Sequence, residues 1–368
     1  MKIKWYIISI LLMLSGNLMG QTAPKYSNEF LSIGVGARAL GMSGAVVASS
    51  EDVTATYWNP SGLLSLDKEM EIGLMHAEYF AGVAGFDFGS AIYRLDDESV
   101  IGASLIRFGV DNIPNTLDLI DNNGNIRYDR LSAFSASDLA VMMSYARKTN
   151  IKNLDVGGNV KIIRRKAGDF GGAWGFGVDF SASYHPENWN FACMAKDVTS
   201  TFNAWSFNQE LLEETWGETG NYLPESSLEI TLPTLNIAGA RHIPLINKFS
   251  ALAEINLFTS FDGKRNTMVK TDLISIDPRA GVEFTYDNIV FLRAGTGNFQ
   301  EIPLSGDEKE YSMQVAVGAG VKFRGFTVDY ALSNLGNSNN FYSHVVSLNF
   351  RFDISEPHKS KSSFDGHE

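Results

Sequence analysis

Several short motifs in this 368-residue chain combine residue types that could do chemistry. The stretch Gly34–Ala39 matches the glycine-rich fingerprint of dinucleotide-binding sites, and Asp52 lies near the acidic position expected downstream. That fingerprint works only between a strand and a helix of a βαβ unit, and the surrounding sequence shows neither a strong apolar strand before it nor a βαβ pattern after it. We therefore expect no cofactor to bind here.

Other candidate catalytic and metal-binding residues are isolated. Ser65 and Lys68 have Ser-x-x-Lys spacing, but the partner motifs of that enzyme class are missing. Asp121–Asn125 resembles the start of a calcium loop and lacks its terminal Glu, so a plain turn is favoured. Cys193 alternates with apolar residues and is expected to be a packed small side chain. The histidines lack ligand spacing: His76, His185, His242, His344, His358 and His367.

These observations predict a protein with no catalytic residues and no metal site. A net charge of −12 also argues against nucleic acid as a partner. The one cysteine excludes an internal disulfide framework.

One charged residue does need an explanation. Arg38 stands alone among small and apolar residues, and a buried cation needs an anionic partner. Candidate partners are Asp179, Glu283 and Asp329, and the alternative is that Arg38 faces water. The small residues let a backbone pack closely, and a turn follows them. The positions that we single out in this segment are Gly34, Gly36, Arg38, Gly41, Gly44, Asn59 and Pro60.

The elements that must position these residues are strands. In Met313–Phe323 every odd position is apolar, and the even positions are Gln, Ala, Gly, Gly and Lys. A strand points alternate side chains to opposite faces, so one face is apolar and the other small or polar. Phe176–Tyr184, Arg279–Tyr286 and Val346–Phe352 repeat this pattern. A soluble sandwich also alternates, but its outward face carries denser charge. A polar inner face rich in Gly, Ser and Asn is typical of a transmembrane barrel.

The strand count and the connections predict one antiparallel barrel of about fourteen strands. We expect strands near residues 70–79, 86–94, 99–111, 138–147, 154–166, 175–184, 189–197, 233–242, 249–260, 279–286, 289–296, 312–323, 326–333 and 343–352. Short turns alternate with longer connections, notably 112–137, 198–232, 261–278 and 297–311. Bacterial outer-membrane barrels have an even strand number and longer outer loops, which would place both termini in the periplasm.

The beginning of the chain predicts export. Lys2 and Lys4 precede an apolar run, Trp5–Leu14, and Gly20-Gln21 is a plausible cleavage point. The run is too short to cross a bilayer as a helix. We therefore divide the chain into a signal peptide (1–20), an N-terminal plug segment (21–66), an outer-membrane barrel (67–352) and a polar tail (353–368).

The segment before the first strand carries a family resemblance. It contains Gly-Ala-Arg-Ala-x-Gly-Met-x-Gly-Ala over 36–45, the acidic pair Glu51-Asp52, and Tyr-Trp-Asn-Pro-x-Gly over 57–62. This combination resembles the plug of FadL-like outer-membrane barrels, and more closely their PorV/PorQ branch from Bacteroidetes-type bacteria. The resemblance implies a fourteen-stranded barrel with a plug. It leaves open whether the chain follows the secretion-system shuttle or a paralogue.

Two functions follow from that resemblance. The first is a protein-interaction component of, or accessory to, type IX secretion and cell-surface protein handling, with outer-membrane lipid, secreted proteins and translocon components as partners. The alternative is a FadL-like transporter of hydrophobic small molecules. The connection 198–232 holds exposed-loop candidates for a protein contact, namely Trp205, Phe207, Trp216 and Tyr222. These aromatics would otherwise lie at the membrane interface or fold back as a lid.

Overall fold

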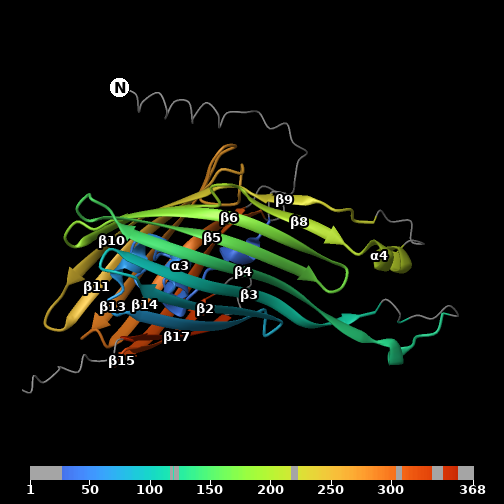
Figure 1. The fold of residues 1–368 in the computed structure, drawn as a ribbon, viewed down its shortest axis with the longest axis horizontal. Helices are drawn as coiled ribbons and strands as arrows, with labels where there is room; N and C mark the ends of the chain where they lie inside the picture. Colours follow the sequence, from blue (N-terminus) through green and yellow to red (C-terminus); the bar gives the residue numbers. More distant parts are fainter. Residues whose placement is uncertain are drawn as a thin grey trace, which may run out of the picture.

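The computed structural model describes residues 27–116, 119, 124–216, 223–303, 309–333 and 343–354. The expected signal peptide and most of the polar tail lie outside these residues. Within them, the strands form one antiparallel sheet that closes on itself, because β1 pairs with β17 from Met70↔Phe352 to Glu78↔His344 (Figure 1). No helix of this described part has the length and apolar character needed to span a membrane.

Fourteen of the strands build the wall of the barrel. They are β1 (Met70–Tyr79), β2 (Ala84–Arg94), β3 (Ser99–Asn115), β4 (Ser132–Lys148), β5 (Leu154–Ala167), β6 (Gly171–Tyr184), β7 (Trp189–Lys196), β10 (Thr234–Pro244), β11 (Phe249–Ser260), β13 (Ser275–Tyr286), β14 (Val290–Pro303), β15 (Lys309–Phe323), β16 (Phe326–Ser333) and β17 (Ser343–Phe352). The predicted all-β class, antiparallel closure and strand number are confirmed.

Three further strands lie where the sequence predicted long loops. β8 (Thr201–Phe207) pairs with β6, β9 (Leu228–Thr231) pairs with β8, and β12 (Val269–Lys270) pairs with β13. The physical reason is the length of β6. Its pairing with β7 is confined to Phe180–Tyr184, so β8 supplies the hydrogen-bond partners for Gly171–Phe176. The prediction that 198–232 is a loop was therefore wrong for β8 and β9.

The strand faces follow the alternation read from the sequence. Val317 and Phe180 are 48% and 58% exposed on the outer surface, whereas Asp179 between its apolar neighbours is buried. Gly318 faces inward against the chain in the lumen, where a Cβ would lie 3.2 Å from the Gly41 Cα. Only glycine permits such a close approach of two backbones.

The two ends of the barrel differ. Short turns at 95–98, 149–153, 185–188, 245–248, 287–289 and 324–325 define one end, which we call the short-turn end. At the opposite end, which we call the outer end, β3 and β4 each run for 17 residues. The two strands therefore take residues at both ends of the expected 112–137 loop, and the remaining connection carries η3 (Tyr128–Arg130). The turns 80–83 and 168–170 at this end are nevertheless short.

Outward-facing aromatic side chains gather near the short turns. Eight exposed aromatic residues lie within four residues of a short turn: Tyr93, Tyr145, Tyr184, Trp189, Phe249, Tyr286, Phe323 and Phe326. Aromatic girdles of this kind mark the membrane–water boundary of outer-membrane barrels. The outward apolar residues above them are thus expected to face lipid.

The chain before β1, residues 27–66, lies inside the barrel, and we call it the lumen segment (Figure 1). It contains η1 (Glu29–Ser32), α2 (Ala37–Gly41), α3 (Ala55–Trp58) and η2 (Pro60–Ser65). Ser27 Oγ donates to Glu229 at the outer end, and the segment joins β1 at the short-turn end. Because the strand number is even, Met70 and Phe352 both lie at the short-turn end. The described chain nevertheless starts at the outer end, at Ser27. The periplasmic position of both termini stays a prediction.

The barrel predicts different costs for a charge on its two faces. Val317→Arg places a guanidinium in lipid at about 2–4 kcal/mol, whereas Gln314→Arg places it on the inner face beside a water-accessible cavity. We expect Val317→Arg to lower the yield of heat-modifiable protein in outer membranes strongly, and Gln314→Arg to leave it near wild type. Equal yields of the two variants would show that the faces are wrongly assigned.

Candidate functional site

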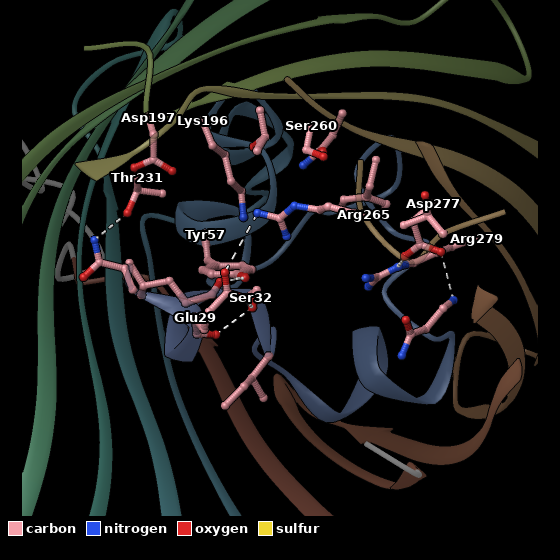
Figure 2. Close-up of a pocket in the computed structure, with 18 of the residues that line it drawn as sticks. Glu29, Ser32, Tyr57, Lys196, Asp197, Thr231, Ser260, Arg265, Asp277 and Arg279 are labelled. Atoms are coloured by element: carbon pink, nitrogen blue, oxygen red, sulfur yellow. Dashed lines mark hydrogen bonds and ion pairs between the residues drawn. The ribbon is translucent and has the colours of Figure 1, made fainter. Parts of the chain in front are cut away.

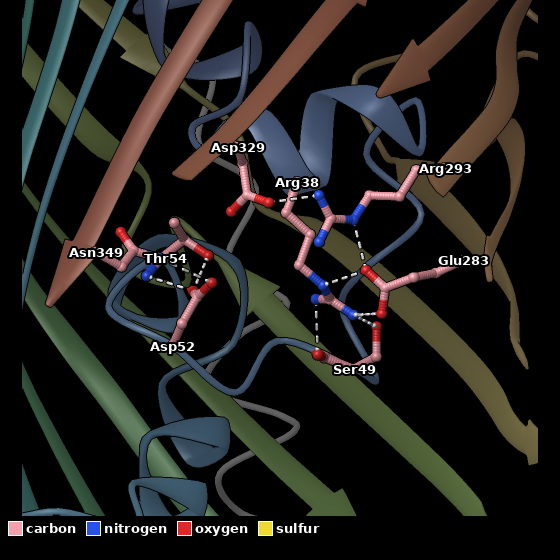
Figure 3. A network of polar contacts seen from close by, with 8 residues as sticks. All are labelled: Arg38, Ser49, Asp52, Thr54, Glu283, Arg293, Asp329 and Asn349. Atoms are coloured by element: carbon pink, nitrogen blue, oxygen red, sulfur yellow. Dashed lines mark hydrogen bonds and ion pairs between the residues drawn. The ribbon is translucent and has the colours of Figure 1, made fainter. Parts of the chain in front are cut away.

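A chain of buried ion pairs fixes α2 to the barrel wall (Figure 3). Arg38 Nε lies 3.0 Å from a Glu283 carboxylate oxygen on β13. Glu283 also accepts from Arg293 on β14 at 2.5 Å, and Arg293 reaches Asp329 on β16 at the same distance. Two of the three candidate carboxylates therefore belong to this network. Glu283 contacts Arg38 directly, and Asp329 is linked to it through Arg293 and Glu283. Removing one partner of such a buried pair typically costs about 3–5 kcal/mol.

The third candidate, Asp179, lies in a separate cluster. Its carboxylate accepts from Lys161 at 2.7 Å, and the same ammonium lies 2.6 Å from Asp197. Asp197 stands at the break between β7 and β8, where its φ is 57°. Lys161 therefore holds this irregular part of the wall to β5 and β6.

The inward polar residues of the strands supply hydrogen bonds to the irregular backbone of the lumen segment. The amide of Ala37 donates to Ser347 Oγ, that of Val47 to Asn256 Oδ1, and that of Ser61 to Ser181 Oγ. Buried backbone amides must find acceptors, and this segment has too little regular structure to provide its own. This requirement explains the Ser and Asn residues on the inner face.

Two of the singled-out glycines, Gly34 and Gly44, pack against the Trp58 side chain. Gly34 and Gly44 have φ of 92° and 77°, and a Cβ on Gly34 would lie 2.9 Å from the Trp58 ring. Gly36 has φ of 88°, and a Cβ at this position would lie 2.7 Å from the Thr54 side chain. Trp58 is buried and its Nε1 donates to the Val35 carbonyl. Glycine is required where the chain bends tightly around the indole.

The Asn59-Pro60 turn joins the lumen segment to the opposite wall. Asn59 Nδ2 donates to the Val47 carbonyl and to Ser183 Oγ, both at 2.8 Å. Pro60 is the first residue of η2, a position where its missing N–H costs nothing. Both residues are buried. The sequence suggested a turn, and the structure shows that the turn is also a contact with β6.

A cavity of about 720 Å³ opens above the lumen segment at the outer end (Figure 2). Apolar residues from the segment and the wall line it, including Leu40, Trp58, Phe108 and Phe258. Lys196 lies over the Tyr57 ring, with its ammonium 3.7 Å from the ring centroid. A cation on an aromatic face is a favourable contact that leaves its N–H groups available for another acceptor. The cavity thus combines an apolar wall with a cation.

Charged residues also stand at the mouth of this cavity. The Arg265 guanidinium lies 2.5 Å from Asp262. It also lies 3.9 Å from Glu29 (Figure 2). Partial burial alone would raise the pKa of the Asp262 carboxyl, but the hydrogen bond and charge of Arg265 hold that pKa below its ordinary value. This loop therefore carries its ion pair at neutral pH, next to η1.

A second cavity of about 310 Å³ lies on the other side of the segment, towards the short-turn end. Arg38 and Asp52 line it, and Asp52 accepts from the hydroxyl and amide of Thr54 (Figure 3). On the wall, Arg351 donates to Glu71 at 2.7 Å. The lumen segment thus separates a partly apolar cavity from a strongly charged one.

The predicted partner-binding aromatics are placed differently from the sequence interpretation. Trp205 and Phe207 lie on β8, half-buried, with rings stacked 5.7 Å apart. Arg165 stacks on Trp205 and forms ion pairs with Asp138 and Glu229. These two aromatics are thus part of a folded hairpin and not of an open loop. Trp216 ends α4 (Gln209–Trp216), and Tyr222 lies outside the described residues.

The glycine-rich motif, the candidate metal ligands and Cys193 can be placed within the described residues, whereas Asp121–Asn123 lie outside them. Gly34–Ala39 is enclosed by strands and lacks a βαβ surrounding. Within the described residues, no group of three or more His, Cys, Asp or Glu side chains is placed to hold a metal ion. Cys193, which we expected to be packed, is exposed on the outer face of β7. The alternation of β7 was predicted correctly, but the face of the strand that carries Cys193 is the outer face of the barrel.

Comparisons with known proteins agree with this fold. The chain is similar to the toluene transporter TbuX of Ralstonia pickettii, with 12% identity, a TM-score of 0.52, and coverage of 87% of this chain and 98% of that one. A FadL homologue of Pseudomonas aeruginosa gives 13% identity, a TM-score of 0.52, and coverage of 86% and 98%. At such identities the likeness concerns the fold alone. No curated protein sequence matches the chain.

A family model provides the more specific match. The model described as "Type IX secretion system protein PorV" matches residues 21–220, which include the lumen segment, the wall strands β1 to β7, and β8. This range contains the glycine-rich stretch, the acidic pair and the Asn59-Pro60 turn on which the resemblance rests. The chain belongs to the PorV family of outer-membrane β-barrels, which is associated with type IX secretion.

Proposed function

We propose that this protein is an interaction component of type IX secretion and cell-surface protein handling, and that its outer end binds secreted proteins or translocon components. The family match carries this proposal. The filled lumen supports it, because a barrel whose interior is bonded to its own chain is suited to presenting surfaces. An open pore would instead need a free passage.

The outer end offers the surface for such a contact. The β3–β4 hairpin, the β8–β9 hairpin and α4 extend beyond the barrel on the same side (Figure 1). Near the tip of the first hairpin Ile126, Tyr128 and Leu131 are 56%, 75% and 50% exposed. Exposed aliphatic and aromatic side chains on ordered hairpins are typical of protein contacts.

A second candidate is the transport of hydrophobic small molecules, favoured by the cavity of about 720 Å³. Its volume lies in the range of small-molecule sites, and its lining places Lys196 beside Tyr57 and Trp58. An apolar molecule with a carboxylate would match this lining. Solved structures of a toluene transporter and of a monoaromatic hydrocarbon channel share the fold at low identity.

The first prediction from this proposal concerns conductance. Deleting residues 28–64 removes the lumen segment, and a barrel of about fourteen strands is too wide for side chains alone to fill. We expect the intact protein to be silent in planar bilayers and the deletion variant to conduct. Heat modifiability on gels confirms that the variant is folded. A folded but silent deletion variant would show that the segment does not seal the lumen.

The second prediction concerns secreted proteins. Replacing residues 208–227 by a short Gly-Ser linker removes α4 while keeping the β8–β9 pairing. We expect proteins exported by the type IX pathway to accumulate in the periplasm, with a matching loss from the cell surface. The control is Ile246→Ser, which changes a 79% exposed side chain at the short-turn end and should leave export unchanged. Normal export in the linker variant would exclude a role for this hairpin.

The third prediction separates the two candidate functions. Cells lacking the protein are compared with cells carrying the wild type or Lys196→Met, and uptake of a labelled long-chain fatty acid is measured. The interaction role predicts equal uptake in all three strains. Uptake that requires the wild-type protein and falls in Lys196→Met would instead establish transport through the cavity.

A further inference from the structure

The outward face of the wall carries a group of charged residues on β1, β2 and β3. The side chains of His76, Glu78, Asp87 and Arg107 are 59%, 67%, 45% and 37% exposed, and Asp111 is 55% exposed beyond them. We call these five residues the outward polar patch. Their exposed neighbours on the same strands, Leu74 and Leu105, are apolar, as the lipid-facing side of a barrel requires.

The members of the patch are linked to one another. His76 Nδ1 lies 2.7 Å from an Asp87 carboxylate oxygen, and Arg107 lies 3.5 Å from Asp87 and 3.2 Å from Asp111. On the adjoining strand, His344 faces Glu78 across the sheet and contacts Tyr330 Oη at 2.6 Å. The polar surface therefore extends over neighbouring strands and is not one stray charge.

The opposite wall shows which residue types lie at the same distance from the short-turn end. Counted from the short-turn end, Ile255 and Leu257 are the seventh and ninth residues of β11, where β1 has His76 and Glu78. Ile237 is the eighth residue of β10 from that end, where β2 has Asp87. All three are exposed and apolar. The apolar band is thus interrupted at β1 to β3 and continuous at the same height on the facing strands β10 and β11.

The patch does not simply mark the upper edge of the membrane. In the turn that follows β1, Val83 is 62% exposed, so an apolar side chain is again presented beyond the charges. Charges that face hydrocarbon destabilise a barrel by an amount that grows with depth. A protein neighbour that pairs with these charges would remove that penalty.

We propose that the outward polar patch is a contact surface for a second protein embedded in the same membrane, and that this partner presents a basic side chain to it. The patch holds three carboxylates, Glu78, Asp87 and Asp111, against one guanidinium, Arg107, so a Lys or Arg of the partner is the complementary group. This inference deepens the proposed interaction role by placing a second, lateral contact on the wall, away from the outer hairpins.

Two other occupants fit less well. A second copy of this chain, docked by the same patch about a twofold axis, would set the excess carboxylates of both copies against each other. Anionic lipid headgroups would meet the same repulsion. The charge of the patch therefore favours a different protein over either of these.

Photo-crosslinking in whole cells tests the proposal. Benzoylphenylalanine replaces Leu105 in the patch, and the matched control replaces Ile255, because each is the exposed seventh residue of its strand on opposite sides of the barrel. We expect a protein adduct from position 105 and none from 255. A lipid adduct alone, or an adduct with the mass of two copies of this chain, would overturn the proposal.

Charge substitution tests the chemistry of the contact. Asp87→Lys should abolish the adduct, while Asp87→Glu should keep it, and both variants must remain heat-modifiable. Replacing the facing basic residue of the identified partner by Asp should restore the adduct with Asp87→Lys. If Asp87→Lys misfolds, the triple change of His76, Asp87 and Arg107 to Leu serves instead, since apolar residues suit lipid. An adduct that persists in a folded variant without these charges would refute the proposed contact.

The outcome is separable from the export experiment on residues 208–227. Impaired export in the linker variant together with no adduct from position 105 would leave the interaction role standing and remove only the lateral contact. An adduct from position 105 with normal export in the linker variant would keep the lateral contact and remove only the role of the β8–β9 hairpin.

Discussion

An irregular backbone can lie at membrane depth only where protein surrounds it and satisfies its hydrogen bonds. The lumen segment has short helices and many bends, so its amides depend on acceptors from the wall. Ser181, Asn256 and Ser347 come from three different strands and each accept one of these amides. The Ser and Asn residues of the inner face follow from this one requirement.

The ion pairs add specificity to these hydrogen bonds. Arg38 is placed by α2, but the carboxylate that receives it is shared with Arg293, which is itself bound to Asp329. The position of one helix therefore depends on three wall strands at once. Whether such a network adds net stability depends on how well it offsets the cost of desolvation. Its geometry nevertheless defines which side of the wall α2 faces.

The sequence predicted the barrel well because period-two alternation is a local property, visible in each strand separately. It also identified Arg38 as a residue in need of a carboxylate, and Glu283 as one candidate. It could not choose between the candidates, because that depends on the register of strands far apart in the chain. The β8–β9 hairpin was missed for a related reason: its pairing is set by the unpaired length of β6, and not by the residues at 201–207. The outward polar patch depends likewise on neighbouring strands meeting at one height.

The closure of the ring has a consequence for the order of assembly. The seam joins β1 to β17, the first and last strands of the wall, so the contact with the greatest separation in sequence completes the barrel. Loop-closure entropy disfavours such distant contacts until the intervening chain is organised. The lumen segment precedes β1 and is bonded to strands on both sides of the seam, such as Ser181 on β6 and Ser347 on β17. It must therefore be inside before the seam closes, and the machinery that inserts this barrel has to fold the wall around an occupied interior.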